Sequence, residues 1–496
     1  MLMKTKYAVP AYAVSIILIL IFLLINSVTG VRGTDQYWYT ANTETLMRNE
    51  PPITNFRFPG MLLRENIADP VTHFTHNGPL LYINKYLGTL MKGSVVSAWK
   101  YSNIFWWLGA TLLLYLTLIK LTETNVAALG ALLYLTTPIV LWQAANFLQE
   151  MWLSFLAAAF LYVTCTIKYG RMSLWFWPLL IFVGTVSHPF FLLTSVFIVV
   201  AGFYYRRNYY SMFSMCVALI LAMVFKDMLF PSSFPPDIKT IITSTIPGET
   251  NLHWQFDDNE VAVSRELMTA KFSEAVKKQF FTLSAMPLTL VTNGGIAAML
   301  ILLVISRLKL DRVLTFTIYS VAAWGAMIVL LQNQPRYQLL ILPALITCVV
   351  VLLGKLPRPS LHKYLLIAAT VLFFVADVYL LQKFRSDIQQ HEKFNLVVTE
   401  ALSNLPADKR YAVIDTERDI LKLVIVRLAP ATGLMIDPRY IQSNNLKKVL
   451  ALYRPDYVLT STPELLENLE LDLRSVGQGT SPESDFQLSA FLVNAQ

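Results

Sequence analysis

The chain has 496 residues, of which 55% are hydrophobic and 15% charged, and its mean hydropathy is +0.51. This composition excludes an ordinary soluble globular protein and is typical of a protein with many membrane-spanning helices. The net charge of +8 does not indicate nucleic-acid binding, because the basic residues form small clusters between apolar runs rather than a stripe or patch. The three cysteines are far apart within apolar runs, so they indicate neither a disulfide framework nor a metal site.

Apolar runs that are long enough to cross about 30 Å of hydrocarbon predict about eleven membrane-spanning helices. The first run follows a basic N-terminus and is longer than the core of a signal peptide, so we expect it to be retained as a span. Pro189 predicts that a new helix starts just after His188. The predicted spans cover residues 8–28, 101–119, 125–143, 150–168, 173–187, 189–205, 210–226, 287–306, 313–331, 338–353 and 364–382.

Basic residues mark alternate connections between these spans. If the N-terminus is cytoplasmic, four successive short cytoplasmic connections carry Lys or Arg, as the positive-inside rule requires. The outer face then receives a first loop over 30–100, a second loop over 227–286 and the whole C-terminal region. We therefore expect a transmembrane domain over residues 1–382. The basic residues are Lys168, Arg171, Arg206, Arg207, Arg307, Lys309, Arg312, Lys355, Arg358 and Lys363.

The first outer loop contains two segments that are typical of helices lying in the membrane interface. "TDQYWYTANTETLM" and "GPLLYINKYLGTLM" mix aromatic and aliphatic residues with polar ones at helical spacing. Asp35 lies at the start of the first segment, beside three aromatic residues. A carboxylate so close to lipid calls for a partner or a function.

From residue 383 onward the composition is that of a soluble domain. "KRYAVIDT", "PDYVLTS" and "FQLSAFLVNA" predict short strands, and "ERDILKLVIVRLA" and "SNNLKKVLALY" predict helices between them. This alternation predicts a small α/β domain over residues 383–496 on the outer face. It has no glycine-rich phosphate loop and no catalytic triad, so we expect a lid or scaffold.

Ionisable residues within the spans lie toward their predicted outer ends. A transporter is expected to carry carboxylates or broken helices near the membrane midplane, so this distribution favours chemistry at the outer surface. The spans that begin after His188 and around Arg336 both run from outside to inside, so their positive N-terminal ends face the outer interface. Each end has a potential cation, and together they would suit a lipid phosphate. The ionisable residues that lie toward predicted outer ends of the spans are Glu150, His188, Lys226, Asp227 and, less extremely, Asp377.

Five segments resemble, in order, those of GT-C type membrane glycosyltransferases, the superfamily of protein O-mannosyltransferases and the lipid A aminoarabinose transferase. "GTDQYWYTANTETLMRNEPP" is similar to the start of the family's first outer loop, where an acid precedes an interfacial helix. "HNGPLLYINKYLGTLM" resembles its "HPPLYY" segment, with Asn77 and Gly78 in place of the first proline. The resemblance covers most of the first 355 residues.

The three later segments carry charged or titratable residues. "FLQEMWLSFLAAAFLYV" resembles the family's "TDMPLAFF" segment, with Glu150 where aspartate is usual. "VSHPFFLLTSVF" is similar to its "TKGP" or "TKPP" turn, with His188 near the family's lysine. "NQPRYQLLILPALI" resembles "RYLLPLLPAL" and places Arg336 and Tyr337.

This resemblance implies a GT-C-like fold and an enzyme that transfers a sugar from a polyprenyl-phosphate donor to an acceptor hydroxyl, with inversion. It implies Asp35 as the general base, with Glu150 as a second catalytic or acceptor-orienting acid. Arg336, His188 and Tyr337 would bind the donor phosphate, and His76 and Tyr82 are further active-site candidates. Some relatives use a metal, but no D-x-D motif lies near Asp35 or Glu150, so no metal or other cofactor is assigned. We expect the bacterial inner membrane, with the active site on the periplasmic side.

Other interpretations stay open. Thr34 and Asp35 could cap a helix, where an acid in the first turn contributes about 0.3–1 kcal/mol, and Glu150 could act in the same way. His188 could hydrogen-bond at a helix break, and Arg336 could be an interface anchor. An O-antigen polymerase or ligase would rely on arginines in large outer loops, whereas a flippase would tolerate the loss of Asp35. The sequence leaves open the sugar and the acceptor, which could be lipid, glycan or protein.

Overall fold

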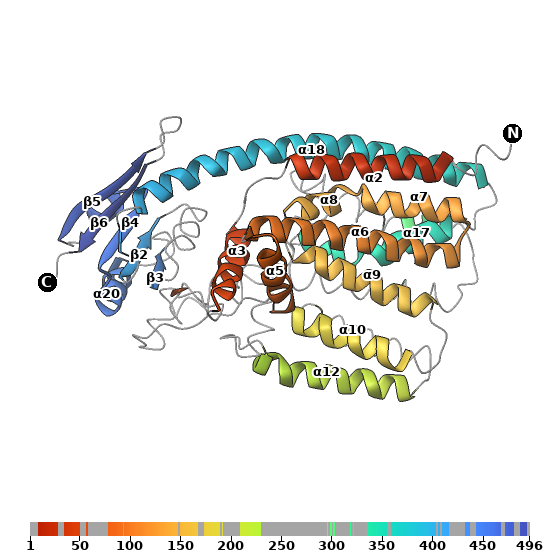
Figure 1. The fold of residues 1–496 in the computed structure, drawn as a ribbon, viewed down its shortest axis with the longest axis horizontal. Coiled ribbons are helices and arrows are strands. Elements are labelled where there is room, and N and C mark those ends of the chain that lie inside the picture. The colour runs from red at the N-terminus through yellow and green to blue at the C-terminus, as the bar shows by residue number, and fades with distance from the viewer. Residues whose placement is uncertain are drawn as a thin grey trace. The chain divides into compact units, whose positions relative to one another are not determined.

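The computed structural model divides into two compact units (Figure 1). We call them the helical unit, made of Met1–Thr29, His76–Pro231 and Glu274–Arg385, and the sheet unit, made of Gly30–Thr75, Ser232–Ser273 and Ser386–Gln496. The structure describes residues 8–27, 34–49, 56–57, 78–92, 94–146, 149–166, 173–188, 191, 209–229, 295, 298–299, 301–302, 318, 321, 335–354, 359–402, 405–406, 409–415, 432–436, 443–467, 472–480 and 487–493.

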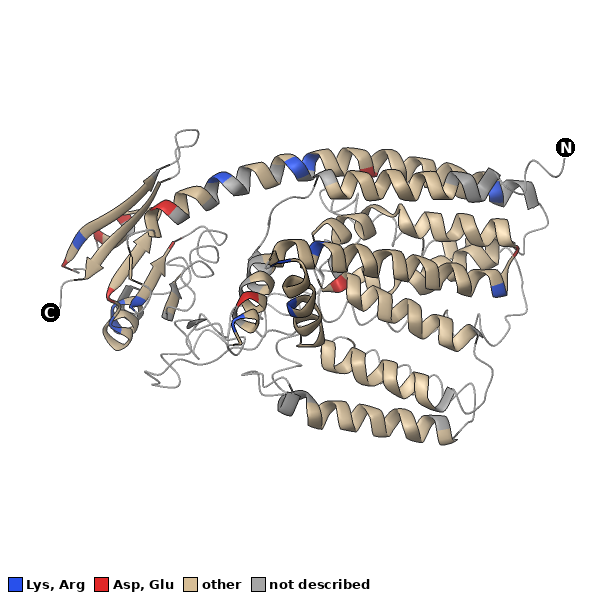
Figure 2. Cartoon of the chain, viewed as in Figure 1, with Lys and Arg blue, Asp and Glu red and all other residues tan. Residues whose placement is uncertain are grey.

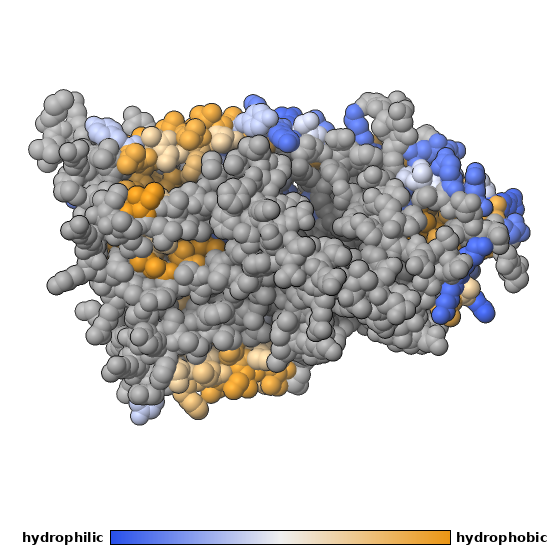
Figure 3. All heavy atoms as spheres, turned by 180° about the vertical axis from the view of Figure 1, so that it is seen from behind, coloured by the Kyte–Doolittle hydropathy of each residue, from blue (hydrophilic) through white to orange (hydrophobic). Residues whose placement is uncertain are grey.

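The helical unit consists of apolar helices that carry few charged residues along their length (Figure 2). Large apolar side chains remain exposed on several of them, which suits a surface in contact with lipid (Figure 3). Its described helices are α2 (Ala8–Ser27), α5 (Gly78–Leu90), α6 (Val95–Leu121), α7 (Thr124–Leu135), α8 (Pro138–Ala145), α9 (Glu150–Thr166), α10 (Ser173–Ser187), α12 (Tyr209–Leu229), η1 (Pro335–Leu340), α17 (Leu342–Gly354) and the first part of α18 (Pro359–Leu402).

The centre of this unit is the packing of α6 against α7 and α9. Glycines allow the helices to approach closely, as small residues do at helix crossings in membranes. A Cβ atom at Gly109 would lie 2.9 Å from the ring of Phe155, and one at Gly130 would lie 2.8 Å from Leu118 and 2.9 Å from Val350. Bulkier residues at these two positions would push the helices apart.

Two helices of the described part, Val95–Leu121 and Lys363–Lys383, are long and apolar enough to cross a membrane. A third crossing results if α7 and α8 together form one span. The apolar helices Ala13–Ile25, Glu150–Cys165, Trp175–Ser187, Met212–Phe225 and Leu342–Gly354 are shorter. The predicted spans at 189–205, 287–306 and 313–331 lie outside the described residues except at isolated positions, so the count of about eleven stays a prediction.

The predicted span over 125–143 contains a break that the sequence analysis did not predict: the helix is interrupted at Thr136 and Thr137, and its two halves differ in direction by 54°. Pro138 opens α8 and cannot continue the hydrogen-bond ladder of α7. Both threonine hydroxyls donate to carbonyls one turn back, and the indole of Trp107 donates to the Leu135 carbonyl at 3.3 Å. The break is thus stabilised by side chains that satisfy its backbone.

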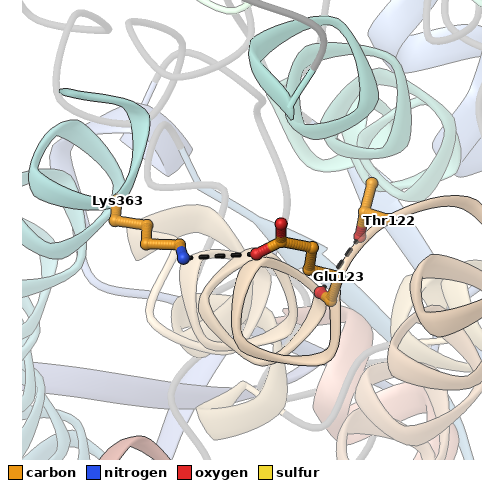
Figure 4. Close-up of polar contacts among 3 residues, drawn as sticks. All are labelled: Thr122, Glu123 and Lys363. Atoms are coloured by element: carbon orange, nitrogen blue, oxygen red, sulfur yellow. Dashed lines mark hydrogen bonds and ion pairs between the residues drawn. The ribbon is translucent and has the colours of Figure 1, made fainter. Parts of the chain in front are cut away.

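Contacts between helix ends show that α6 runs in the opposite direction to α2 and α18. At one end, Lys363 Nζ lies 3.2 Å from Glu123 Oε2, and the neighbouring Thr122 hydroxyl lies 3.5 Å from the Glu123 carbonyl (Figure 4). At the other end, Lys100 Nζ donates to the Ile25 carbonyl at 2.8 Å, near the C-terminus of α2. Glu123, between α6 and α7, and Lys363, near the N-terminus of α18, therefore lie at the same end of the unit, as the predicted topology requires.

The sheet unit contains a six-stranded sheet in the order β1-β3-β2-β4-β6-β5. Strands β1 (Phe56–Arg57), β3 (Thr432–Ile436), β2 (Arg410–Ile414) and β4 (Tyr457–Thr460) are parallel, and β6 (Gln487–Val493) and β5 (Leu473–Thr480) continue the sheet in antiparallel fashion. The four-residue helix α21 (Glu464–Glu467) follows β4. Apolar residues of β2, β3 and β4 form a core with α20 (Ser443–Tyr453), as an α/β domain requires.

The predicted strands in "KRYAVIDT", "PDYVLTS" and "FQLSAFLVNA" and the predicted helix "SNNLKKVLALY" are confirmed as β2, β4, β6 and α20. The predicted helix "ERDILKLVIVRLA" lies outside the described residues. Strands β3 and β5 were not predicted, and neither was β1, which comes from the first outer loop. The end of α18 packs on β5, where a Cβ atom at Gly477 would lie 3.2 Å from the Ala401 carbonyl oxygen.

Candidate functional site

Four elements of the helical unit meet where α9 begins. The indole of Trp152, in the first turn of α9, donates to the hydroxyl of Ser187, the last residue of α10, at 3.0 Å. Ser154 donates to the Leu339 carbonyl of η1 at 3.1 Å. Helix η1 also packs against α8, whose last residues precede α9. We call this meeting point of the ends of α8 and α10, the start of α9 and η1 the α9 junction.

Glu150 is the first residue of α9 and is 1% exposed. A carboxylate in the first turn interacts favourably with the helix dipole, by up to about 2 kcal/mol in partly buried geometry. Removing a carboxylate from water costs considerably more than that unless it is paired. The position therefore suits an acid that is kept for its interactions at the junction rather than for helix stability alone.

His188 follows α10 directly and is 3% exposed. Its backbone N–H donates to the Gly184 carbonyl at 3.0 Å, and its own carbonyl accepts from the Phe191 N–H at 3.0 Å. Phe191 packs so closely on Gly184 that a Cβ atom there would lie 2.0 Å from the ring. The backbone of His188 is thus held by hydrogen bonds to α10 and to Phe191.

Arg336 and Tyr337 lie in η1, a 3₁₀ helix that precedes α17. Their backbone is at the α9 junction, because Leu339 of the same short helix accepts the hydrogen bond from Ser154. The structure does not describe the side chains of these two residues. The segment that leads into the predicted span over 338–353 is therefore a 3₁₀ turn, and the first N–H groups of such a turn have no carbonyl partner within the helix.

The remaining candidates lie on other elements or outside the described residues. Asp35 is the second residue of α3 (Thr34–Met47), which confirms the predicted helix, and it belongs to the sheet unit; its side chain is not described. Tyr82 lies on α5, the other predicted helix of the first outer loop, and is 44% exposed. His76 lies outside the described residues. The described part of the chain contains no group of three or more His, Cys, Asp or Glu that could hold a metal ion.

The structure adds neutral polar residues that the sequence analysis missed. Gln143 and Gln338 are 3% and 1% exposed, and Asn103 donates to the Gln143 carbonyl at 3.2 Å. Gln143 ends one predicted span and Gln338 begins another, and neither was singled out in the sequence. The available signal was an amide at the end of each predicted span, because polar residues at such positions are costly unless they have a partner or a function.

Solved structures with the same architecture are known from two kinds of membrane glycosyltransferase. ArnT from Cupriavidus metallidurans, bound to undecaprenyl phosphate, is similar over 98% of this chain and 98% of its own, with a TM-score of 0.59 and 12% identity. This chain has a GT-C fold. No protein-family model and no curated protein sequence matches it.

The archaeal oligosaccharyltransferase AglB from Archaeoglobus fulgidus shares this GT-C architecture. Its complex with an inhibitory peptide and a dolichol-phosphate is similar over 92% of this chain and 70% of its own, with a TM-score of 0.55 and 12% identity. The apo form of the Archaeoglobus fulgidus oligosaccharyltransferase matches over 97% of this chain and 75% of its own, with a TM-score of 0.56 and 13% identity. At such low identity the likeness concerns the fold.

Proposed function

We propose that this GT-C protein transfers a sugar from a polyprenyl-phosphate donor to an acceptor hydroxyl at the outer face of the membrane. The observation that carries this proposal is the gathering of Glu150, His188 and η1 at one end of the helical unit, within a fold shared with ArnT and AglB. Those two proteins were solved with undecaprenyl phosphate and with dolichol-phosphate. A lipid phosphate is therefore the natural ligand to test.

Arg336, His188 and Tyr337 would bind the donor phosphate. A guanidinium forms paired hydrogen bonds with phosphate oxygens, and a phenol or imidazole N–H can donate a further one. Helix ends whose N–H groups lack intrahelical partners add to this stabilisation. As the glycosidic bond breaks, negative charge accumulates on the phosphate, so these groups would stabilise the transition state more than the ground state.

Asp35 would accept the proton of the acceptor hydroxyl as that oxygen attacks the anomeric carbon from the side opposite the phosphate. The carbon–oxygen bond to the acceptor forms while the bond to the phosphate breaks, which inverts the configuration at the anomeric carbon. Glu150 would orient the acceptor or the sugar. We place this activity in the bacterial inner membrane, with the active site on the periplasmic side, and the acceptor is a lipid, a glycan or a protein.

The direct test is Asp35→Asn, which removes the base and keeps the size of the side chain. We expect sugar transfer to fall by a factor of about 10²–10⁴, the usual contribution of a general base. Mass spectrometry of lipid A, envelope glycans and glycoproteins would compare cells that carry the wild type, the variant or neither. Glu44→Gln is the matched control, because Glu44 is an exposed acid on the same helix α3.

A stably inserted Asp35→Asn protein with full transfer activity would rule out the general base. A wild-type protein that changes the transverse distribution of a lipid-linked glycan, and forms no new glycosidic bond, would instead establish a flippase.

A further inference from the structure

Three buried side chains near the α9 junction carry hydrogen-bonding atoms that no described residue satisfies. They are Oε1 of Gln143, both Oε1 and Nε2 of Gln338, and Nε1 of Trp106. The exposed fractions of these residues are 3%, 1% and 9%. Because an unsatisfied polar atom in a protein interior is costly, a cluster of such atoms calls for a further group that completes their hydrogen bonds.

Contacts between four elements bring these side chains to one region. Trp106 lies one turn after Asn103 on α6, and Asn103 donates to the Gln143 carbonyl of α8 at 3.2 Å. The ring centroid of Trp106 lies 4.4 Å from that of Trp152 on α9. Gln338 precedes Leu339, whose carbonyl accepts from Ser154 of α9. The three residues thus approach the start of α9 from α6, α8 and η1.

The chemistry of these atoms selects the kind of ligand. They offer two acceptors and two donor groups, and none of the three side chains is charged. A hydroxyl group both donates and accepts, so several hydroxyls on one molecule match this set, whereas a phosphate accepts only and an ammonium donates only. The neighbouring rings of Trp106, Trp152 and Phe155 add apolar faces. Amides beside aromatic rings suit a neutral sugar.

We propose that Gln143, Gln338 and Trp106 form a recognition subsite for the hydroxyl groups of the donor sugar. This inference rests on the proposed function, since it assigns the sugar part of the same donor to this part of the junction. These three residues would bind the sugar of the donor, whereas Arg336 and His188 would bind its phosphate. The donor class is thus a neutral, hydroxyl-rich sugar.

The test compares glycosylated lipids with the bare lipid on the purified full-length protein in detergent micelles. The probes are undecaprenyl phosphate and its mannosyl, glucosyl, galactosyl and arabinosyl phosphodiesters. We expect the wild type to bind at least one of these glycolipids about tenfold or more tightly than undecaprenyl phosphate, through two or more hydrogen bonds to the sugar. Gln143→Met and Gln338→Met should remove most of that preference, and neither should change the affinity for undecaprenyl phosphate.

Asn84→Leu provides the matched control. Asn84 is likewise a fully buried amide of the helical unit, but its Nδ2 donates to the Leu80 carbonyl at 2.9 Å and its Oδ1 accepts from Ser102 at 2.8 Å. Its loss should lower the thermal stability and leave the ratio of the two affinities unchanged. If a methionine variant does not fold, Gln→Asn at the same position and Trp106→Phe keep the test available, because each withdraws or displaces the relevant atom.

A wild type that binds every glycolipid no more tightly than the bare lipid would overturn the inference. So would variants that keep the preference, as expected if buried water completes these hydrogen bonds, or variants that lose affinity for both lipids equally. Sugar transfer is scored separately. If the wild type prefers a glycolipid but transfers no sugar, the proposed function is contradicted and the subsite proposal stands. If the variants transfer sugar and keep the wild-type preference, only the subsite proposal is contradicted.

Discussion

Some residues at the α9 junction can be recognised from the sequence, whereas the role of others is visible only in the structure. Glu150 and His188 stand out in the sequence because a titratable residue at the end of an apolar run is unusual. Gly184 does not stand out, although its missing side chain makes room for Phe191 and so helps to hold the backbone at His188. Asp377, in α18, is fully buried, and no described residue pairs with its carboxylate oxygens.

Gly184→Ala should destabilise the protein by about 1–3 kcal/mol, the usual cost of overpacking, because the new methyl group would displace the ring of Phe191. Thermal unfolding of the purified protein in detergent would measure this as a lower Tm. Gly354→Ala is the control, since a Cβ atom there would meet Thr122 only at 3.8 Å. Equal Tm values for both variants would contradict the packing argument.

At the scale of elements, the hydrophobic pattern predicted where some helices start and missed features that tertiary contacts determine. Helices α9 and α10 begin where the sequence indicated, at Glu150 and Ser173, because polar residues frame their apolar runs. The break between α7 and α8 was missed because the pair Thr-Pro is compatible with either a kinked helix or a broken one. Strand β1 was missed because two residues carry no periodicity, and its pairing with β3 is set by tertiary structure.

Strand β1 makes a prediction about the edge of the sheet. Phe56→Pro removes a backbone donor from the segment that pairs with Gly433 of β3. We expect amides of Thr432–Ile436 to exchange hydrogen about tenfold faster, as on a strand that has lost one neighbour, while those of β4 and β6 stay protected. Hydrogen exchange with mass spectrometry would measure this. Phe56→Val, which keeps the N–H, should exchange as the wild type does; equally fast exchange in both variants would show that the side chain, and not the pairing, protects β3.

At the scale of the whole molecule, one ion pair agrees with the topology that the basic residues predict. Glu123 and Lys363 form this ion pair, so the two residues share one end of the helical unit, as the predicted topology requires. This pair stabilises the fold little, by at most about 1 kcal/mol, because both side chains are substantially exposed. The ion pair is informative about the fold, because it shows that two residues 240 positions apart in the sequence lie close together.

Topology can be tested with single cysteines in a variant whose three native cysteines are replaced by serine. A membrane-impermeant maleimide added to spheroplasts should label Glu464→Cys, in the predicted periplasmic domain, and should leave Glu123→Cys and Lys363→Cys unlabelled until the cells are opened. Labelling of Glu123→Cys in intact spheroplasts would invert the assigned orientation or require a different number of spans.

The sequence by itself determined the class of protein, the alternation of apolar and basic segments, most helix positions and a set of titratable residues at span ends. These features follow from local pattern, since the cost of placing charge in hydrocarbon acts on each segment separately. Only the tertiary structure decided that the ends of α8 and α10, the start of α9 and η1 meet, that α7 and α8 break, and that β1 joins the C-terminal sheet. Such contacts link residues that are far apart in the chain, and side-chain packing and hydrogen bonding select them.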